Sequence, residues 1–198
     1  MTFRAFYSHK LTWLVEHLLF ADMPVCLAVV TYSHNPVVHY SLMGLTAVYM
    51  SLIVWVLRTR LSDIGLSVSQ FSSHVWQLLP GTLVICGIIL TLKYIDIVHA
   101  LPATQGVLWV YLFISVPLQE IVFRSLCVWR CSLSWKNPVF ITVFTSLNFA
   151  FYHLFFHSSQ LIIGVFLINL FWSYYYFKQK DVAATTLSHV LIGLAYFI

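Results

Sequence analysis

The sequence predicts an all-α, polytopic membrane helix bundle of about seven transmembrane helices with its N-terminus in the cytoplasm. Hydrophobic residues make up 61% of the 198 residues and charged residues only 8%, whereas charged residues average about 25% in soluble domains. The apolar residues form seven runs of roughly 20 residues, the length that crosses the hydrocarbon core of a bilayer. Lysine and arginine lie mainly at the ends of these runs.

The expected spans leave no room for a soluble domain, and no internal repeat or linker divides them. We therefore expect a single membrane domain over residues 1–198. The first span carries Glu16, His17 and Asp22, which makes it the least apolar. We place Glu16 and His17 at the membrane interface, with a role in chemistry as the alternative. Residues 58–77 contain LSDIGL and several serines, so we expect a loop with a short amphipathic piece on the membrane surface. The spans are residues 11–32, 37–57, 76–92, 106–129, 138–157, 161–177 and 182–198.

The distribution of positive charge predicts the orientation, because cytoplasmic loops of membrane proteins are enriched in lysine and arginine. With the N-terminus inside, Lys93 lies in an outer loop and Arg124 lies within a span. The other eight of the ten basic residues lie on the cytoplasmic side: Arg4, Lys10, Arg58, Arg60, Arg130, Lys136, Lys178 and Lys180. We therefore expect a multi-pass protein with its C-terminus outside.

Residues 115–131 carry charge inside an apolar run. An ionisable side chain at bilayer depth costs about 2.5 to 3.5 kcal/mol on insertion scales, so such residues mark functional sites by default. Glu120 and Arg124 are four residues apart and share a helix face, and Gln119 lies about 100° away from Glu120. The simple alternative is an ion pair within one helix that only neutralises itself.

Two histidines lie within other spans. His153 shares a face of the fifth span with Phe149 and His157, and His189 shares a face of the seventh span with Gly193. A buried imidazole needs a hydrogen-bond partner. The most economical arrangement is one polar cavity shared by the fourth, fifth and seventh spans.

Short segments in the second half of the chain resemble the signatures of one protein family. Residues 117–124, PLQEIVFR, are similar to a motif EExxxR with a phenylalanine before the arginine. Residues 149–153, FAFYH, resemble FxxxH, and residues 188–193, SHVLIG, resemble HxxxN but end in glycine. The family is that of the CAAX prenyl protease 2 and bacteriocin-processing proteins (CPBP, also called Abi). LSDIGL also looks like a segment common in it.

The resemblance implies an intramembrane glutamic-type endopeptidase that hydrolyses a peptide bond near the C-terminal or membrane-anchoring part of its substrate. It places Gln119 where the family has its general-base glutamate, and it matches Glu120 and Arg124 to the rest of the first motif. His153 then corresponds to the histidine that holds the attacking water, and His189 to a residue of the oxyanion pocket.

Two positions depart from the family pattern. Gln119 cannot accept a proton from water, because an amide is not a useful base. Either Glu120 replaces it as base, or the chain is a weakened or inactive relative that acts as a membrane binding protein, or the glutamine was introduced to disable an enzyme. Gly193 stands in place of the asparagine of the oxyanion pocket. The candidates for substrate or oxyanion contacts are Asn148, Asn169, Phe149 and Gly193 itself.

The residues also suggest other site chemistries. His153 and His157 with Glu120 have the types of a zinc site, but Leu154 occupies the place of the HExxH glutamate. We expect no metal and no cofactor. Short loops and the lack of repeated halves argue against a transporter. The aromatic run FWSYYYF at 171–177 is typical of an interfacial belt, with lining of the cavity as the alternative.

The expected partners follow from the same observations. A net charge of +4 is too small and too scattered to indicate nucleic acid. We expect the lipid bilayer and a membrane-associated protein or peptide substrate, and we leave the oligomeric state open. The expected location is the bacterial inner (plasma) membrane.

Overall fold

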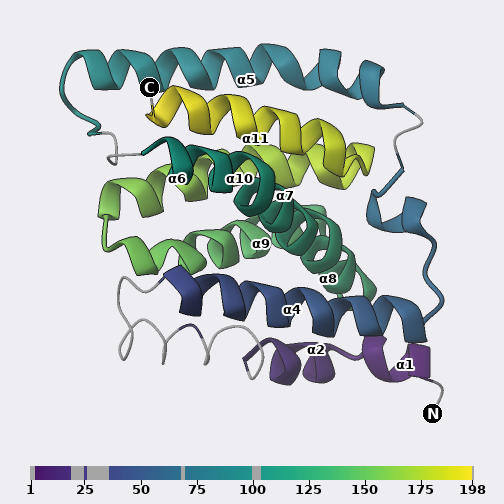
Figure 1. The fold of residues 1–198 in the computed structure, drawn as a ribbon. Helices are drawn as coiled ribbons and strands as arrows, with labels where there is room; N and C mark the ends of the chain where they lie inside the picture. The colour runs from purple at the N-terminus through teal and green to yellow at the C-terminus, as the bar shows by residue number, and fades with distance from the viewer. Residues whose placement is uncertain (1–2, 19–24, 26–35, 68–69, 100–103, 198) are drawn as a thin grey trace.

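The computed structural model describes residues 3–18, 25, 36–67, 70–99 and 104–197. Within these residues the regular secondary structure is helical and contains no strand, as Figure 1 shows. The predicted all-α class is therefore confirmed. The single domain over 1–198 stays a prediction.

The helices follow the predicted apolar runs closely, since each run is bounded by polar, proline or glycine residues. The segment from α6 to α8 is one continuous helix, which is interrupted by π-helical turns at Tyr111–Ser115 and Glu120–Cys127. The α-helices are α1 (Phe3–Ser8), α2 (Lys10–His17), α4 (Pro36–Val56), α5 (Phe71–Tyr94), α6 (Gln105–Val110), α7 (Val116–Gln119), α8 (Val128–Ser134), α9 (Pro138–Tyr152), α10 (Ser159–Gln179) and α11 (Val182–Phe197).

Four helical segments in the described part of the chain are long and apolar enough to cross a membrane: Phe71–Tyr94, Gln105–Ser134, Pro138–Phe156 and Ser159–Gln179. Two shorter apolar helices, Tyr40–Val56 and Val182–Phe197, match the second and seventh predicted spans. The first predicted span, 11–32, begins in α2 and otherwise lies almost wholly outside the described residues. The number of seven spans and the orientation therefore stay predictions.

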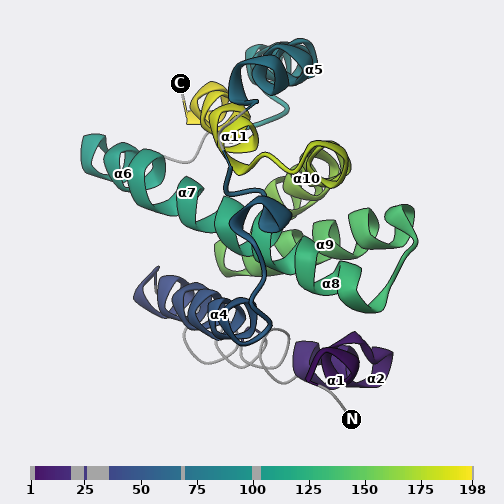
Figure 2. The same cartoon turned by 90° about the vertical axis from the view of Figure 1, so that its right-hand side faces the viewer.

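The continuous α6–α8 helix occupies the middle of the bundle. In Figure 1 it runs obliquely across the other helices, with α5 and α11 side by side at the top, α9 and α10 paired beside it, and α4 below. Figure 2 shows the same helix between α4 on one side and α10 and α11 on the other. Side chains of α6–α8 can therefore meet residues from both halves of the chain.

Local sequence signals explain where the helices of the second half begin. The Asn137 side chain accepts hydrogen bonds from the backbone N–H groups of Val139 and Phe140 at the start of α9. The Ser158 hydroxyl does the same for Leu161 in α10, at 3.3 Å. Asp181 Oδ1 accepts from Ala184 N at 2.9 Å in α11. These are N-caps, which satisfy backbone donors that a helix start leaves unpaired.

The LSDIGL segment is a connection whose Ile64 and Gly65 pack against the bundle while its other four residues are exposed, and its place on the membrane surface stays a prediction. Its residues Leu61–Ile64 form a 3-10 turn, and Ile64 is buried beside Leu126 and Trp129. The Ser125 hydroxyl donates to Ile64 O at 2.5 Å, and Val182 N donates to Gly65 O at 3.0 Å. The segment thus joins the central helix to the start of α11.

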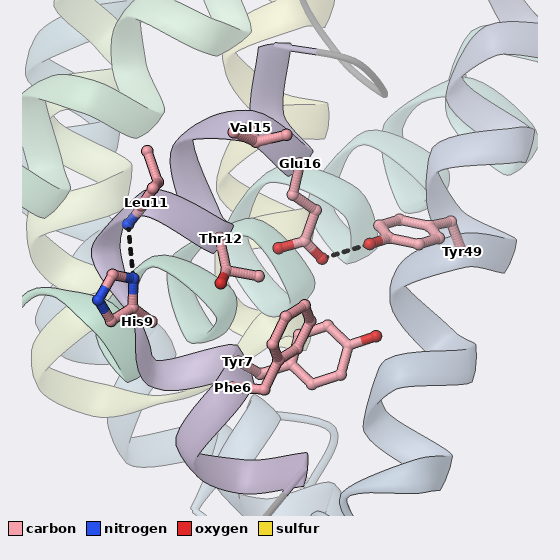
Figure 3. Close-up of a pocket in the computed structure, with 8 residues that line it drawn as sticks. All are labelled: Phe6, Tyr7, His9, Leu11, Thr12, Val15, Glu16 and Tyr49. Atoms are coloured by element: carbon pink, nitrogen blue, oxygen red, sulfur yellow. Dashed lines mark hydrogen bonds between the residues drawn. The ribbon is translucent and has the colours of Figure 1, made fainter. Parts of the chain in front are cut away.

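Glu16 is buried between helices of the protein, and its placement at the depth of the membrane interface stays a prediction. Its carboxylate pairs with Arg130 and accepts a hydrogen bond from the Tyr49 hydroxyl. Figure 3 shows Glu16 pointing toward Tyr49 beside a pocket of about 390 Å³. His17 is also buried and stacks on Trp13 at a ring distance of 5.6 Å. A charge on α2 is tolerated because α4 and α8 supply its partners.

We predict that Gly65→Ala destabilises the protein by about 1 to 3 kcal/mol, the range for a strained backbone position. Gly65 has φ +71°, and a Cβ there would lie 2.5 Å from Tyr176 Oη and 2.9 Å from Lys180 O. Thermal unfolding in detergent measures the effect. The matched control is Gly87→Ala, where a Cβ meets nothing within 4 Å. Equal melting temperatures for the two variants would contradict the prediction.

Candidate active site in the centre of the bundle

The Glu120 carboxylate lies at the centre of the site. Its Oε1 atom is 2.8 Å from His189 Nδ1 and 3.3 Å from Arg124 Nη1. Glu120 and Arg124 have no solvent-exposed surface. The structure therefore brings together the predicted ionisable residues of the fourth and seventh spans. Glu120 contacts His189 of another helix in addition to Arg124 of its own helix.

Arg124 is held between aromatic rings. Its guanidinium carbon lies 4.4 Å from the ring centroid of Phe149 and 4.8 Å from that of Trp172. Its three nitrogens make no hydrogen bond of good geometry within the described part of the chain. The positive charge is therefore balanced by the Glu120 carboxylate and by the faces of two aromatic rings.

Contacts with Glu120 and Trp172 orient the His189 imidazole. Its Nδ1 faces Glu120, and its ring packs against Trp172 in a tilted arrangement, with the ring centroids 4.4 Å apart. Trp172 Nε1 donates to Ser188 Oγ at 2.9 Å, and that oxygen is 2.7 Å from Thr82 Oγ1. Because an ionised carboxylate only accepts hydrogen bonds, Nδ1 carries the proton in this pair. The lone pair of the neutral imidazole is then on Nε2.

A cavity of about 880 Å³ lies next to this cluster, and His189 and Trp172 form part of its wall. Apolar side chains from several helices form most of its wall, and Gln119, His153 and His189 contribute polar groups. Glu120 and Arg124 are not among its lining residues. The neighbouring residues of the first motif thus have different environments: Gln119 faces the cavity, and Glu120 is buried behind His189.

The Gln119 side chain forms part of the cavity wall. Its Nε2 donates to Ser115 Oγ at 2.9 Å, and its Oε1 has no hydrogen-bond partner among the described residues. The amide is therefore fixed by its nitrogen, and its oxygen remains as an acceptor. The residue is 7% exposed, and its Oε1 atom is buried.

His153 lies at the end of α9, where the α-helix changes to the 3-10 turn His153–Phe156. Its Nδ1 is 2.7 Å from Phe149 O, and because a carbonyl only accepts, Nδ1 carries the proton. His157 is exposed, with φ +49°. The expected helical face shared by His153 and His157 is therefore absent, because the helix ends between them. Within the described residues no three His, Cys, Asp or Glu side chains are grouped as metal ligands.

The two asparagines predicted as candidate donors, Asn148 and Asn169, do not line the cavity. Asn148 Nδ2 donates to Phe144 O in its own helix. Asn169 Nδ2 donates to the hydroxyls of Ser146 and Ser173. Neither is among the lining residues of the cavity, whereas Phe149 and Gly193 are. The structure does not bring Asn148 or Asn169 to His189, because local hydroxyl and carbonyl groups occupy their amides.

Two residues of the site were not singled out from the sequence. Trp172 lines the cavity and contacts both Arg124 and His189, although its aromatic run was interpreted as an interfacial belt. Tyr111 also lines the cavity. A signal existed for Tyr111, because Tyr111, Ser115 and Gln119 follow one another at four-residue spacing and thus share a helix face.

The fold and the site together define an integral membrane protein with a buried Glu–His pair beside an apolar cavity. A family model described as type II CAAX prenyl endopeptidase Rce1-like matches residues 102–195. Over these residues the match supports the resemblance to the CPBP family that the motifs predicted. Neither the curated proteins nor the solved structures give a match to the chain.

The matched region corresponds to α6–α11 and contains Gln119, Glu120, Arg124, His153 and His189. The Rce1-like family is a family of endopeptidases. Together with the apolar helices, the match supports a membrane-embedded peptidase in general, acting in the lipid bilayer on membrane-associated substrates.

We predict that Glu120→Gln destabilises the protein by about 3 to 5 kcal/mol, because it leaves the buried charge of Arg124 without its counter-ion. Thermal unfolding of the purified protein measures this loss. The double variant Glu120→Gln/Arg124→Met removes both charges and should recover most of it. If the double variant is no more stable than Glu120→Gln, the ion pair does not account for the loss.

Proposed function

We propose that the chain is an intramembrane glutamic-type endopeptidase in which the Glu120–His189 pair activates water. The proposed reaction hydrolyses a peptide bond near the C-terminal or membrane-anchoring part of a protein or peptide substrate. The observation that carries the proposal is the 2.8 Å contact between Glu120 Oε1 and His189 Nδ1, with His189 on the cavity wall.

Peptide hydrolysis needs a base that takes a proton from water. The Glu120 carboxylate keeps the His189 proton on Nδ1, so that Nε2 is the free basic nitrogen. A carboxylate supports a catalytic histidine in the same way in hydrolytic triads. Glu120 is buried and does not line the cavity, so we assign it as the positioning residue and His189 as the base. Arg124 compensates the charge of Glu120.

The remaining steps follow from this assignment. His189 Nε2 takes one proton from water, and the hydroxide forms a bond to the carbonyl carbon. The resulting tetrahedral intermediate collapses when its C–N bond breaks and His189 returns the proton to the leaving nitrogen. Gln119 and His153 line the same cavity. In this proposal they hold the water in line with the carbonyl carbon.

The cavity suggests the type of substrate. Its wall is mostly apolar and lies among the membrane helices, so a lipid-modified or helical tail can bury apolar surface in it. The name of the matched family refers to prenylated CAAX substrates, and a substrate of this type forms part of the proposal. The expected location remains the bacterial plasma membrane.

A second candidate function is a catalytically inactive membrane binding protein. The observation that favours it is Gln119, whose amide faces the cavity where the resemblance implies a general-base glutamate. A glutamine can hold water but cannot deprotonate it. In this alternative the same cavity binds the tail of a membrane-associated protein without cleaving it.

We predict that His189→Ala and Glu120→Gln each lower kcat/KM for cleavage of a lipid-modified peptide by about 10² to 10⁴-fold, the range for removal of general-base catalysis. Cleavage in detergent or liposomes is followed by mass spectrometry. Asn148→Ala is the control, because Asn148 belongs to the same bundle and is not among the lining residues of the cavity. Full activity of Glu120→Gln, once its folding has been verified, would overturn the role of the pair.

Gln119→Glu distinguishes the two candidate functions. We expect it to raise kcat, because a carboxylate at the cavity wall adds a second base, while the unchanged protein retains measurable cleavage. Substrate binding without cleavage in both proteins would instead support the binding protein. If neither protein binds nor cleaves the peptide, both candidates fail for that substrate.

A further inference from the structure

Gly193 of α11 allows a tyrosine to approach the backbone beside His189. A Cβ atom added to Gly193 would lie 1.7 Å from Tyr111 Oη and 2.4 Å from Tyr111 Cζ. Cβ atoms do not approach other atoms this closely, so no side chain at position 193 is compatible with the observed position of Tyr111. The phenol therefore occupies the space that a side chain at 193 would fill.

The Tyr111 hydroxyl lies at the edge of the proposed reaction site. It donates to the backbone carbonyl of His189 with an O–O distance of 3.3 Å, and its ring packs against Phe197 at 4.9 Å. Tyr111, Gln119, His189 and Gly193 all line the same cavity. The ring is thus held by packing, and its polar end is next to the imidazole.

The hydrogen bond of Tyr111 is weak enough to be exchanged. O–H···O bonds usually measure about 2.7 to 2.8 Å, so a bond of 3.3 Å is long. A carbonyl oxygen that gains negative charge is a stronger acceptor than a neutral peptide carbonyl. The phenol can therefore transfer its donation from His189 O to a substrate oxygen during the reaction without losing its proton.

Other polar side chains of the cavity are less well placed for this role. Gln119 Nε2 donates to Ser115 Oγ, Gln160 Nε2 to Ile97 O, and the Tyr196 hydroxyl to His99 O. The Tyr111 hydroxyl, in contrast, donates to the backbone of His189 itself.

We propose that Tyr111 is a catalytic residue whose hydroxyl stabilises the oxyanion formed at the scissile peptide bond. This inference rests on the proposed peptidase function and extends it to a residue outside the three motifs. Gly193 contributes indirectly, because its lack of a side chain admits the phenol to this position. Tyr111 and Gly193 together would then provide a donor where the HxxxN motif has an asparagine.

Tyr111→Phe tests the proposal, because it removes the hydroxyl and keeps the ring. Loss of one oxyanion donor lowers kcat by about 10² to 10³-fold, and we expect a fall of that size with little change in KM or melting temperature. Tyr175→Phe is the matched control, since the Tyr175 hydroxyl also donates to a backbone carbonyl, that of His74, but Tyr175 is not among the lining residues of the cavity. If wild type cleaves and Tyr111→Phe cleaves equally well, this inference fails while the proposed function stands.

A rescue experiment tests whether position 193 and Tyr111 share one volume. Tyr111→Ala creates space, and Tyr111→Ala/Gly193→Asn places an amide donor in it. We expect the double variant to be at least tenfold more active than Tyr111→Ala. Gly193→Asn alone should be unstable because of the contact at 1.7 Å. A stable and fully active Gly193→Asn protein would contradict the shared volume.

Binding of a phosphinate peptide supplies a readout that does not need turnover, because its charged oxygen resembles the oxyanion. Wild type should bind the phosphinate more tightly than the matching amide peptide, and Tyr111→Phe should reduce this preference about tenfold or more. Equal weakening of both ligands would overturn the role of Tyr111 as an oxyanion donor. Absence of any phosphinate preference in wild type would overturn the proposed function together with this inference.

Discussion

The structure of this bundle depends on a carboxylate that is buried at its centre. Glu120 is fully buried, and an isolated charge there would be strongly unfavourable. Arg124 on the same helix and His189 on α11 contact the same Glu120 oxygen. Phe149 and Trp172 cover the guanidinium. The position of one charge therefore constrains the central helix, α9, α10 and α11 at the same time.

The charged residues Glu120 and Arg124 are fully buried, and His189 separates them from the apolar cavity. The ion pair lies behind His189, and His189, Gln119 and His153 face a space whose wall is mostly apolar. Such an arrangement can hold water and a carbonyl group beside fixed charges while excluding bulk solvent, which strengthens electrostatic interactions. The π-helical turns on both sides of Gln119 are typical of functional segments in helices.

Much of the architecture was predictable because lipid imposes a simple rule on sequence. Apolar runs bounded by polar residues indicated α4, α5 and the helices of the second half, and the cost of buried charge indicated Glu120 and Arg124. The sequence did not indicate the partners of Glu16, because Arg130 and Tyr49 are distant from it along the chain. His157 does not share a helix face with His153, because α9 ends at Tyr152. No sequence pattern indicated that end.

By itself, the sequence determined that this chain is helical and membrane-embedded and that its second half carries the CPBP motifs, because hydropathy and residue spacing are local properties. The tertiary structure decided which side chain of the Gln119–Glu120 pair faces the cavity and that Tyr111 lies against Gly193. Adjacent residues of a helix point about 100° apart, so only the packing of the neighbouring helices determines which of the two directions leads to the cavity.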